Sequence, residues 1–127
     1  MSKSEKEKSL GTDLSIWIDH QFLGTPNFKE LLIHEFFHAI HYVINPNEKK
    51  WIREGLAEVF TYFITHKLNS FNLAAVLGNP AVNIKGEFHS EVLDRSSYGH
   101  SMLYFYYLQR ECGGRDFFWG LANVKKK

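Results

Sequence analysis

The feature that most constrains this chain is the stretch HEFFHAIH at residues 34–41, which lies inside an apolar segment running from Leu31 to Val43. An apolar segment of this length is expected to be buried, and burying ionisable side chains costs several kcal/mol unless they are paired or bind a metal. Histidines four residues apart emerge on one face of a helix, one turn apart. The stretch therefore predicts a helix on which His34 and His38 bind a single metal ion.

Glu35 follows the first of these histidines directly and is expected to project beside the metal-binding face. A carboxylate at this position can reach a water molecule at the metal without being a ligand itself. The HExxH pattern thus predicts His34 and His38 as ligands of one catalytic zinc ion and Glu35 as the catalytic base.

Two histidines leave the metal one ligand short, because catalytic zinc usually takes three protein ligands. His41 is three residues beyond His38, and a helix rise of about 1.5 Å per residue places it too far along and rotated away from the pair. The pattern HExxHxxGxxH is also absent, since positions 41 and 44 hold His41 and Ile44. We therefore expect His41 to be a structural or surface histidine.

The order of secondary structure indicates one small strand-bearing unit followed mostly by helices. Leu14, Ile16 and Ile18 alternate with more polar residues, which predicts a half-buried strand over residues 14–19. Helices are predicted over residues 26–45, 51–67, 72–77, 97–112 and 116–124.

Local signals set the expected ends of these helices. Thr25 or Asn27 is expected to cap the first helix, and Asn45-Pro46 to end it, because a residue before proline is disfavoured in the α conformation. Ser97 is expected to cap the third long helix, which would end at Gly113-Gly114.

Composition limits the classes of protein to consider. A chain of 127 residues suits a single domain, here residues 1–127, with a poorly ordered tail at 1–12 and a basic tail at 125–127. Because 15 Lys and Arg balance 14 Asp and Glu, neither nucleic acid nor a membrane surface is an expected partner. A single cysteine, Cys112, and no apolar leader or membrane-spanning stretch suit a cytoplasmic protein. A monomer or weak self-association is expected.

Residues 51–60 read WIREGLAEVF, and together with HExxH they resemble the gluzincin zinc metallopeptidases, in particular compact members such as the minigluzincins. In that family a second helix reading roughly W-L-x-E-G-x-A-E/S-Y follows the HExxH helix, and its Glu before Gly is the third zinc ligand. The resemblance assigns this role to Glu54. Glu58, one turn later, is the alternative ligand, or else accepts the second ring N–H of a zinc-bound histidine.

A third element of the resemblance lies at residues 97–108, SYGHSMLYFYYL. Similar gluzincins have a Tyr a few residues into a later helix, followed by a small residue and an apolar stretch, and its hydroxyl stabilises the oxyanion. The resemblance assigns this role to Tyr98, with His100 as the alternative transition-state stabiliser.

The resemblance implies an α+β, zincin-like fold: a small N-terminal β-sheet subdomain and a zinc-binding helix, followed by a mainly α-helical C-terminal subdomain. It also implies zinc-dependent hydrolysis of peptide bonds. The Gly-x-Met-Glu-Asn motif of the large zinc aminopeptidases is absent from residues 1–33, which favours an endopeptidase acting on flexible polypeptides. The alternative is a catalytically silent or latent zinc-binding interaction module.

Overall fold

The computed structural model describes residues 16–81, 84 and 91–124. Within these residues the regular secondary structure is entirely helical. The elements, in chain order, are the 3₁₀ helix η1 (His20–Phe22), α2 (Phe28–Ile44), α3 (Lys50–Thr65), α4 (Ser70–Gly78), α5 (Glu91–Cys112) and α6 (Arg115–Ala122).

The predicted α+β fold with an N-terminal β-sheet is wrong for the described part of the chain. Residues 16–19 have no regular secondary structure and lead into η1, while Leu14 and Ser15 lie outside the described residues. Alternation of side chains is not sufficient for a strand, because its backbone groups need a second strand to pair with, and no described segment supplies one. Trp17, at the centre of the predicted strand, is 41% exposed. The predicted tails at 1–12 and 125–127 also lie outside the described residues.

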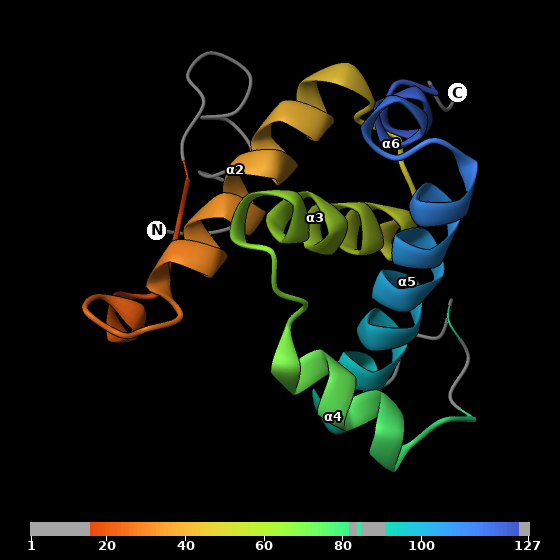
Figure 1. The fold of residues 1–127 in the computed structure, drawn as a ribbon. Helices are drawn as coiled ribbons and strands as arrows, with labels where there is room; N and C mark the ends of the chain where they lie inside the picture. The colour runs from red at the N-terminus through yellow and green to blue at the C-terminus, as the bar shows by residue number, and fades with distance from the viewer. Residues whose placement is uncertain (1–15, 82–83, 85–90, 125–127) are drawn as a thin grey trace.

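The first two predicted helices form close to the expected limits. Asn27 holds the N-cap position of α2 without a side-chain hydrogen bond, whereas the hydroxyl of Thr25 donates to the Phe22 carbonyl instead. At the other end, the Asn45 N–H donates to the His41 carbonyl, and Pro46 prevents a further turn. The short connection to α3 makes the two helices neighbours, and they pack side by side (Figure 1).

Helix α5 begins six residues earlier than predicted. Ser97 is buried inside it, and its hydroxyl donates to the carbonyl of Ile84 at 2.9 Å rather than capping a helix start. This hydrogen bond is a tertiary contact that the local pattern could not reveal. The predicted end is correct, because Gly113 and Gly114 have φ of 125° and 69°, values that favour glycine and end the helix.

Helix α3 lies at the centre of the molecule, with α2 along one side and α5 along the other (Figure 1). Helix α4 packs on α5. Helix α6, which follows α5 directly in the chain, also contacts α5. The core joins α2, α3, α5 and α6 through Phe37, Leu56, Ala57, Val59, Phe105, Phe118 and Ala122.

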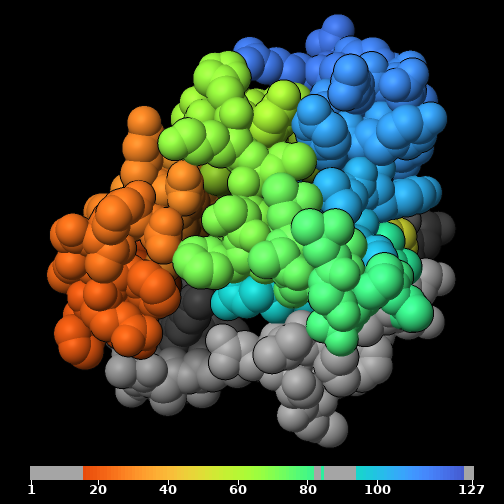
Figure 2. All heavy atoms as spheres, turned by 60° about the horizontal axis from the view of Figure 1, so that its bottom comes forward, coloured from red at the N-terminus to blue at the C-terminus, as the bar shows by residue number. Residues whose placement is uncertain are grey.

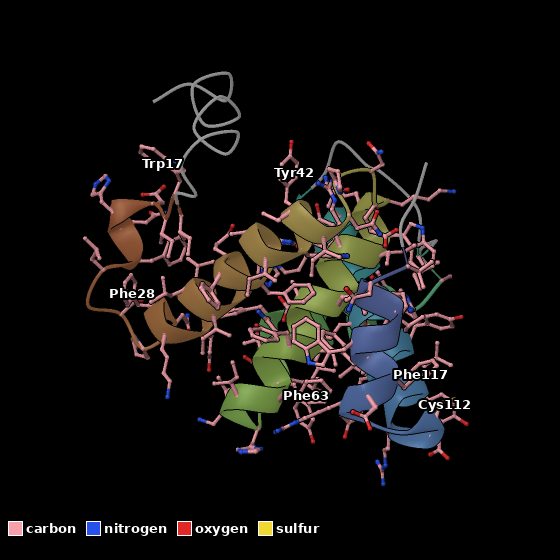
Figure 3. All side chains as sticks on the ribbon, turned by 90° about the horizontal axis from the view of Figure 1, so that it is seen from above. Trp17, Phe28, Tyr42, Phe63, Cys112 and Phe117 are labelled. Carbon is pink, nitrogen blue, oxygen red and sulfur yellow. The ribbon has the colours of Figure 1, made fainter. Side chains whose placement is uncertain are left out.

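Helix α2 has a second apolar face that the described residues do not cover. Leu32, Phe36 and Val43 are exposed there, and Tyr42 points away from the packed helices (Figure 3). In the described part of the chain, no helix combines the length and the apolar composition that crossing a bilayer requires.

Candidate metal centre and active site

Helix α2 places His34 and His38 on one face, one turn apart. Their rings meet edge to face with centroids 4.5 Å apart, and their Nε2 atoms are 2.9 Å apart. Two imidazole nitrogens at this distance repel each other through their lone pairs unless a proton or a metal ion lies between them. The helix therefore directs two donor atoms at one point.

Helix α3 brings Glu54 to the same point, across the packed pair of helices. Its Oε2 lies 3.0 Å from His34 Nε2, and its Oε1 lies 3.4 Å from His38 Nε2. Zinc bound tetrahedrally at about 2.0–2.1 Å from each ligand holds its donor atoms roughly 3.3 Å apart. The observed separations lie close to this value, so the three side chains fit one ion.

Glu58, one turn after Glu54, contacts the other nitrogen of the His34 ring. Its Oε1 is 2.8 Å from His34 Nδ1, and both side chains are largely buried. With Nδ1–H donating to this carboxylate, the Nε2 of His34 remains directed at Glu54 and His38. This contact was proposed from the sequence as one of two roles for Glu58, and the geometry suits orientation of the histidine.

The charges of the cluster are strongly coupled. Burial disfavours the charged form of His34, but hydrogen bonds with Glu54 and Glu58 outweigh burial and raise the pKa of His34 to about 10. Burial likewise disfavours the Glu54 carboxylate, yet hydrogen bonds with His34 and His38 hold the pKa of Glu54 well below its usual range. Two carboxylates thus favour positive charge at the centre of the cluster, as a proton or as a metal ion.

Glu35 lies beside the two histidines on α2. The ligand atoms of His34, Glu35 and His38 all lie within 4.8 Å of one another, so this group could hold a metal ion. The proximity alone admits Glu35 either as a ligand or as a base next to the metal. Glu54 contacts both histidines from α3, so carboxylates from both helices lie beside the histidines.

A cavity of about 1130 Å³ opens beside the cluster, lined by residues of α2, α3, α4 and α5. His34, Glu35, Glu54 and Glu58 form one part of the wall, and Tyr98 reaches the same cavity from α5. Figure 2 looks toward this face, with the start of α2 in orange on one side and α4 in green on the other. The cluster and Tyr98 therefore line one cavity.

The two remaining histidines considered from the sequence lie elsewhere. His41 is 1% exposed and packs against Phe37, and neither of its ring nitrogens has a hydrogen-bond partner among the described residues. Its nearest carboxylate, on Glu48, is 3.8 Å away, beyond hydrogen-bond reach. Burial, with the positive charges of His38 and Arg53, lowers the pKa of His41 to about 4. His41 is thus a neutral core residue rather than part of the cluster.

His100 is two residues beyond Tyr98 and so faces a different side of α5. It is not among the described residues that line the cavity, and its Nε2 is buried without a hydrogen-bond partner among them. Of the two side chains proposed to stabilise the oxyanion, Tyr98 is therefore the one that lines the cavity among the described residues.

Sequence reasoning missed the part of the cavity wall that α4 and α5 form. Phe71 and Asn72 on α4, together with Asp94 and Arg95 on α5, line this cavity. No spacing or motif in the sequence could have placed them there, because the wall forms only when α4 folds back against α5.

Comparison of the chain with known protein families, with curated proteins and with solved structures finds no match. The resemblance to gluzincins therefore depends on the motifs at residues 34–38 and 51–58 and stays a prediction. The functional inference depends on the cluster itself, whose His34, Glu35 and His38 could hold a metal ion.

Proposed function

We propose that this protein is a zinc-dependent peptidase that cleaves peptide bonds within flexible polypeptides. The observation that supports this most is the convergence of His34, His38 and Glu54 on one point at the edge of a large cavity. A cluster of satisfied core residues would not need a cavity, and a purely structural zinc site would not need Glu35 beside it.

The residues that would hold zinc are His34 and His38 through Nε2, and Glu54 through its carboxylate. Two imidazoles and one carboxylate are a ligand set typical of catalytic zinc, which keeps a further position for water or substrate. When bound, zinc supplies a Lewis acid that polarises the scissile carbonyl and lowers the pKa of a water ligand to about 7.

Glu35 handles the proton in the proposed reaction. Its carboxylate takes a proton from the water molecule as the water oxygen attacks the carbonyl carbon. It then gives this proton to the amine nitrogen as the carbon–nitrogen bond breaks, so that the acid and amine products form and the carboxylate is regenerated.

Tyr98 and Glu58 support this chemistry from two sides. Tyr98 lines the cavity from α5, and in the proposed reaction its hydroxyl donates a hydrogen bond to the carbonyl oxygen as that oxygen gains negative charge. Glu58 accepts the Nδ1–H of His34 and holds the ring in the orientation that zinc requires.

The cavity favours an extended peptide as substrate. Its volume of about 1130 Å³ exceeds the range of about 300–1,000 Å³ typical of small-molecule sites. The lining combines apolar side chains such as Phe22, Leu31 and Phe71 with polar ones such as Asn69 and Asn72. We therefore propose an endopeptidase whose substrates must be flexible enough to enter between the helices.

The test is hydrolysis of casein and of a quenched fluorescent peptide by the wild-type protein and by Glu35→Gln, each at measured zinc content. We expect the wild type to be active and chelator-sensitive, and Glu35→Gln to bind zinc but to lose at least about 10²-fold in kcat. Glu111→Gln, an exposed substitution at the end of α5, is the matched control and should leave turnover unchanged.

Equal turnover by wild type and Glu35→Gln would reject Glu35 as the base. Stoichiometric zinc without turnover in either protein would instead favour the silent or latent zinc-binding module. Absence of stoichiometric zinc would reject both functions, because each depends on the metal.

A further inference from the structure

Two glycines lie directly after two residues of the proposed site. Gly55 follows Glu54 on α3, and Gly99 follows Tyr98 on α5. Both are buried where helices cross, and neither has a positive φ. Backbone conformation therefore does not explain them, and the reason must lie in what surrounds them.

Gly99 lies where α5 meets α4. A Cβ added there would be 2.5 Å from the backbone oxygen of Asn72 and would also overlap Cγ2 of Val76. A backbone oxygen inside a helix cannot rotate away, so any side chain at position 99 would force α5 and α4 apart. Asn72 and Tyr98 both line the cavity, so this separation would move one wall against the other.

Gly55 lies where α3 meets α5. A Cβ added there would be 2.6 Å from Cδ2 of Phe105 and would overlap the hydroxyl of Ser101. That hydroxyl, which is fully buried, donates to the carbonyl of Trp51 and joins α5 to the first turn of α3. The contact therefore sets how closely α5 approaches the helix that bears Glu54.

We propose that Gly99 and Gly55 are positioning residues that hold the Tyr98 hydroxyl at the correct place relative to the metal-binding group. This inference depends on the proposed function, because it concerns the group that stabilises the oxyanion. Contacts made by closely packed backbones are stiff, and a displacement of about 1 Å at an active site can cost about 10²-fold in rate. Gly99 and Gly55 would thus set the distance between the Tyr98 hydroxyl and the metal-binding group.

A substitution at Gly99 should change oxyanion stabilisation without changing zinc binding. The three proposed zinc ligands lie on α2 and α3, whereas Gly99 lies at the crossing of α4 with α5. Gly99→Ala should therefore leave the zinc dissociation constant within about twofold of wild type. It should weaken binding of a peptide phosphonate, whose charged oxygens resemble the oxyanion, by about tenfold. The kcat of Gly99→Ala should fall together with its affinity for the phosphonate, while its KM changes little.

A double-mutant cycle with Tyr98→Phe tests whether Gly99 acts through Tyr98. If it does, Gly99→Ala should weaken phosphonate binding in the wild-type background and add less than about twofold in the Tyr98→Phe background. Gly120→Ala is the matched control, because it is also a helical glycine, and a Cβ there would meet nothing within 4 Å. Gly120→Ala should change neither the dissociation constant for zinc nor that for the phosphonate.

Ser101→Ala provides a second variant, should Gly99→Ala fail to fold as judged by circular dichroism. It removes the hydrogen bond to the Trp51 carbonyl without adding volume. We expect a smaller loss of phosphonate binding, about threefold, that again disappears in the Tyr98→Phe background.

Equal losses in the two backgrounds, or a parallel loss of zinc affinity, would overturn the positioning role while leaving the proposed peptidase intact. A zinc-loaded wild type that neither hydrolyses peptides nor binds the phosphonate would overturn the proposed function, and the positioning role with it.

Discussion

The surroundings of His34 explain how an apolar helix accommodates ionisable side chains. Each ring nitrogen faces a carboxylate, Glu58 at Nδ1 and Glu54 at Nε2, so burial is offset by hydrogen bonds to charged partners. His41, three residues beyond His38, has no such partner in the described part of the chain, and burial lowers its pKa to about 4, which keeps it neutral in the core. The same residue type thus has two different environments within two turns of one helix.

The first prediction at this scale concerns the metal ligands. Glu54→Ala should lose stoichiometric zinc after dialysis, because it removes the carboxylate that contacts both histidines. His41→Ala should retain zinc, because His41 lies in the core, away from the cluster. Metal analysis by mass spectrometry checks both, and loss of zinc by His41→Ala with retention by Glu54→Ala would reject the ligand set.

The second prediction concerns pH and the metal-free protein. Because the pKa of His34 rises from 6.5 unfolded to about 10 folded, the folded state binds more protons between these values. The stability that His34 contributes is fully present below pH 6.5 and is lost as the pH rises towards 10. The difference in melting temperature between wild type and Glu54→Gln, which weakens the pairing, should therefore narrow from pH 6.5 to 9.5. A difference in melting temperature that stays constant over this pH range would contradict the coupling between His34 and Glu54.

At the scale of the elements, three helices contribute to the proposed active site. Helix α2 carries His34, Glu35 and His38, α3 carries Glu54 and Glu58, and α5 carries Tyr98. Helices α2 and α3 were predicted nearly to the residue, because periodicity and the Asn45-Pro46 break are local signals. The start of α5 was not, because Ser97 bonds to Ile84 rather than to its own helix.

The prediction for the elements compares two helical glycines. Gly120→Ala should stabilise the protein by about 0.5–1 kcal/mol, because alanine loses less conformational freedom on folding and meets nothing at this position. Gly55→Ala should destabilise it by about 1–3 kcal/mol, because the new methyl group overlaps Ser101 and Phe105. Urea denaturation of both variants checks the signs, and stabilisation by Gly55→Ala would show that α3 and α5 do not pack this closely.

At the scale of the whole molecule, the site depends on the core beneath it. Phe37, between the two histidine turns of α2, is fully buried and contacts the rings of Phe60, Phe118 and Trp119. These contacts join α2 to α3 and α6, so the helix that bears His34 and His38 is held partly by residues more than 80 positions later in the chain.

The prediction for the whole molecule uses two adjacent phenylalanines. Phe37→Ala should cost about 3–5 kcal/mol of unfolding free energy through the cavity that it leaves. Phe36→Ala should cost less than about 1 kcal/mol, because Phe36 is 49% exposed. Urea denaturation of the metal-free proteins measures both changes. Similar losses of unfolding free energy for the two variants would contradict the orientation of α2 that buries Phe37 and exposes Phe36.

Local patterns in the sequence were sufficient for most of the helices and for the grouping of His34 with His38. Spacing along one helix determines that these two histidines share a face, and a family resemblance pointed to Glu54, which contacts both. The strand predicted over residues 14–19 is absent from residues 16–19, which the structure describes, because a strand depends on a partner that no local pattern supplies.

Only the tertiary structure decided which side chains complete the site. The approach of α5 to α3 and α4, which Gly55 and Gly99 permit, brings Tyr98 into the cavity and leaves His100 outside it. The folding of α4 against α5 adds Phe71 and Asn72 to the cavity lining. These are contacts between residues far apart in the chain, and their geometry depends on how whole helices pack rather than on any neighbouring residue.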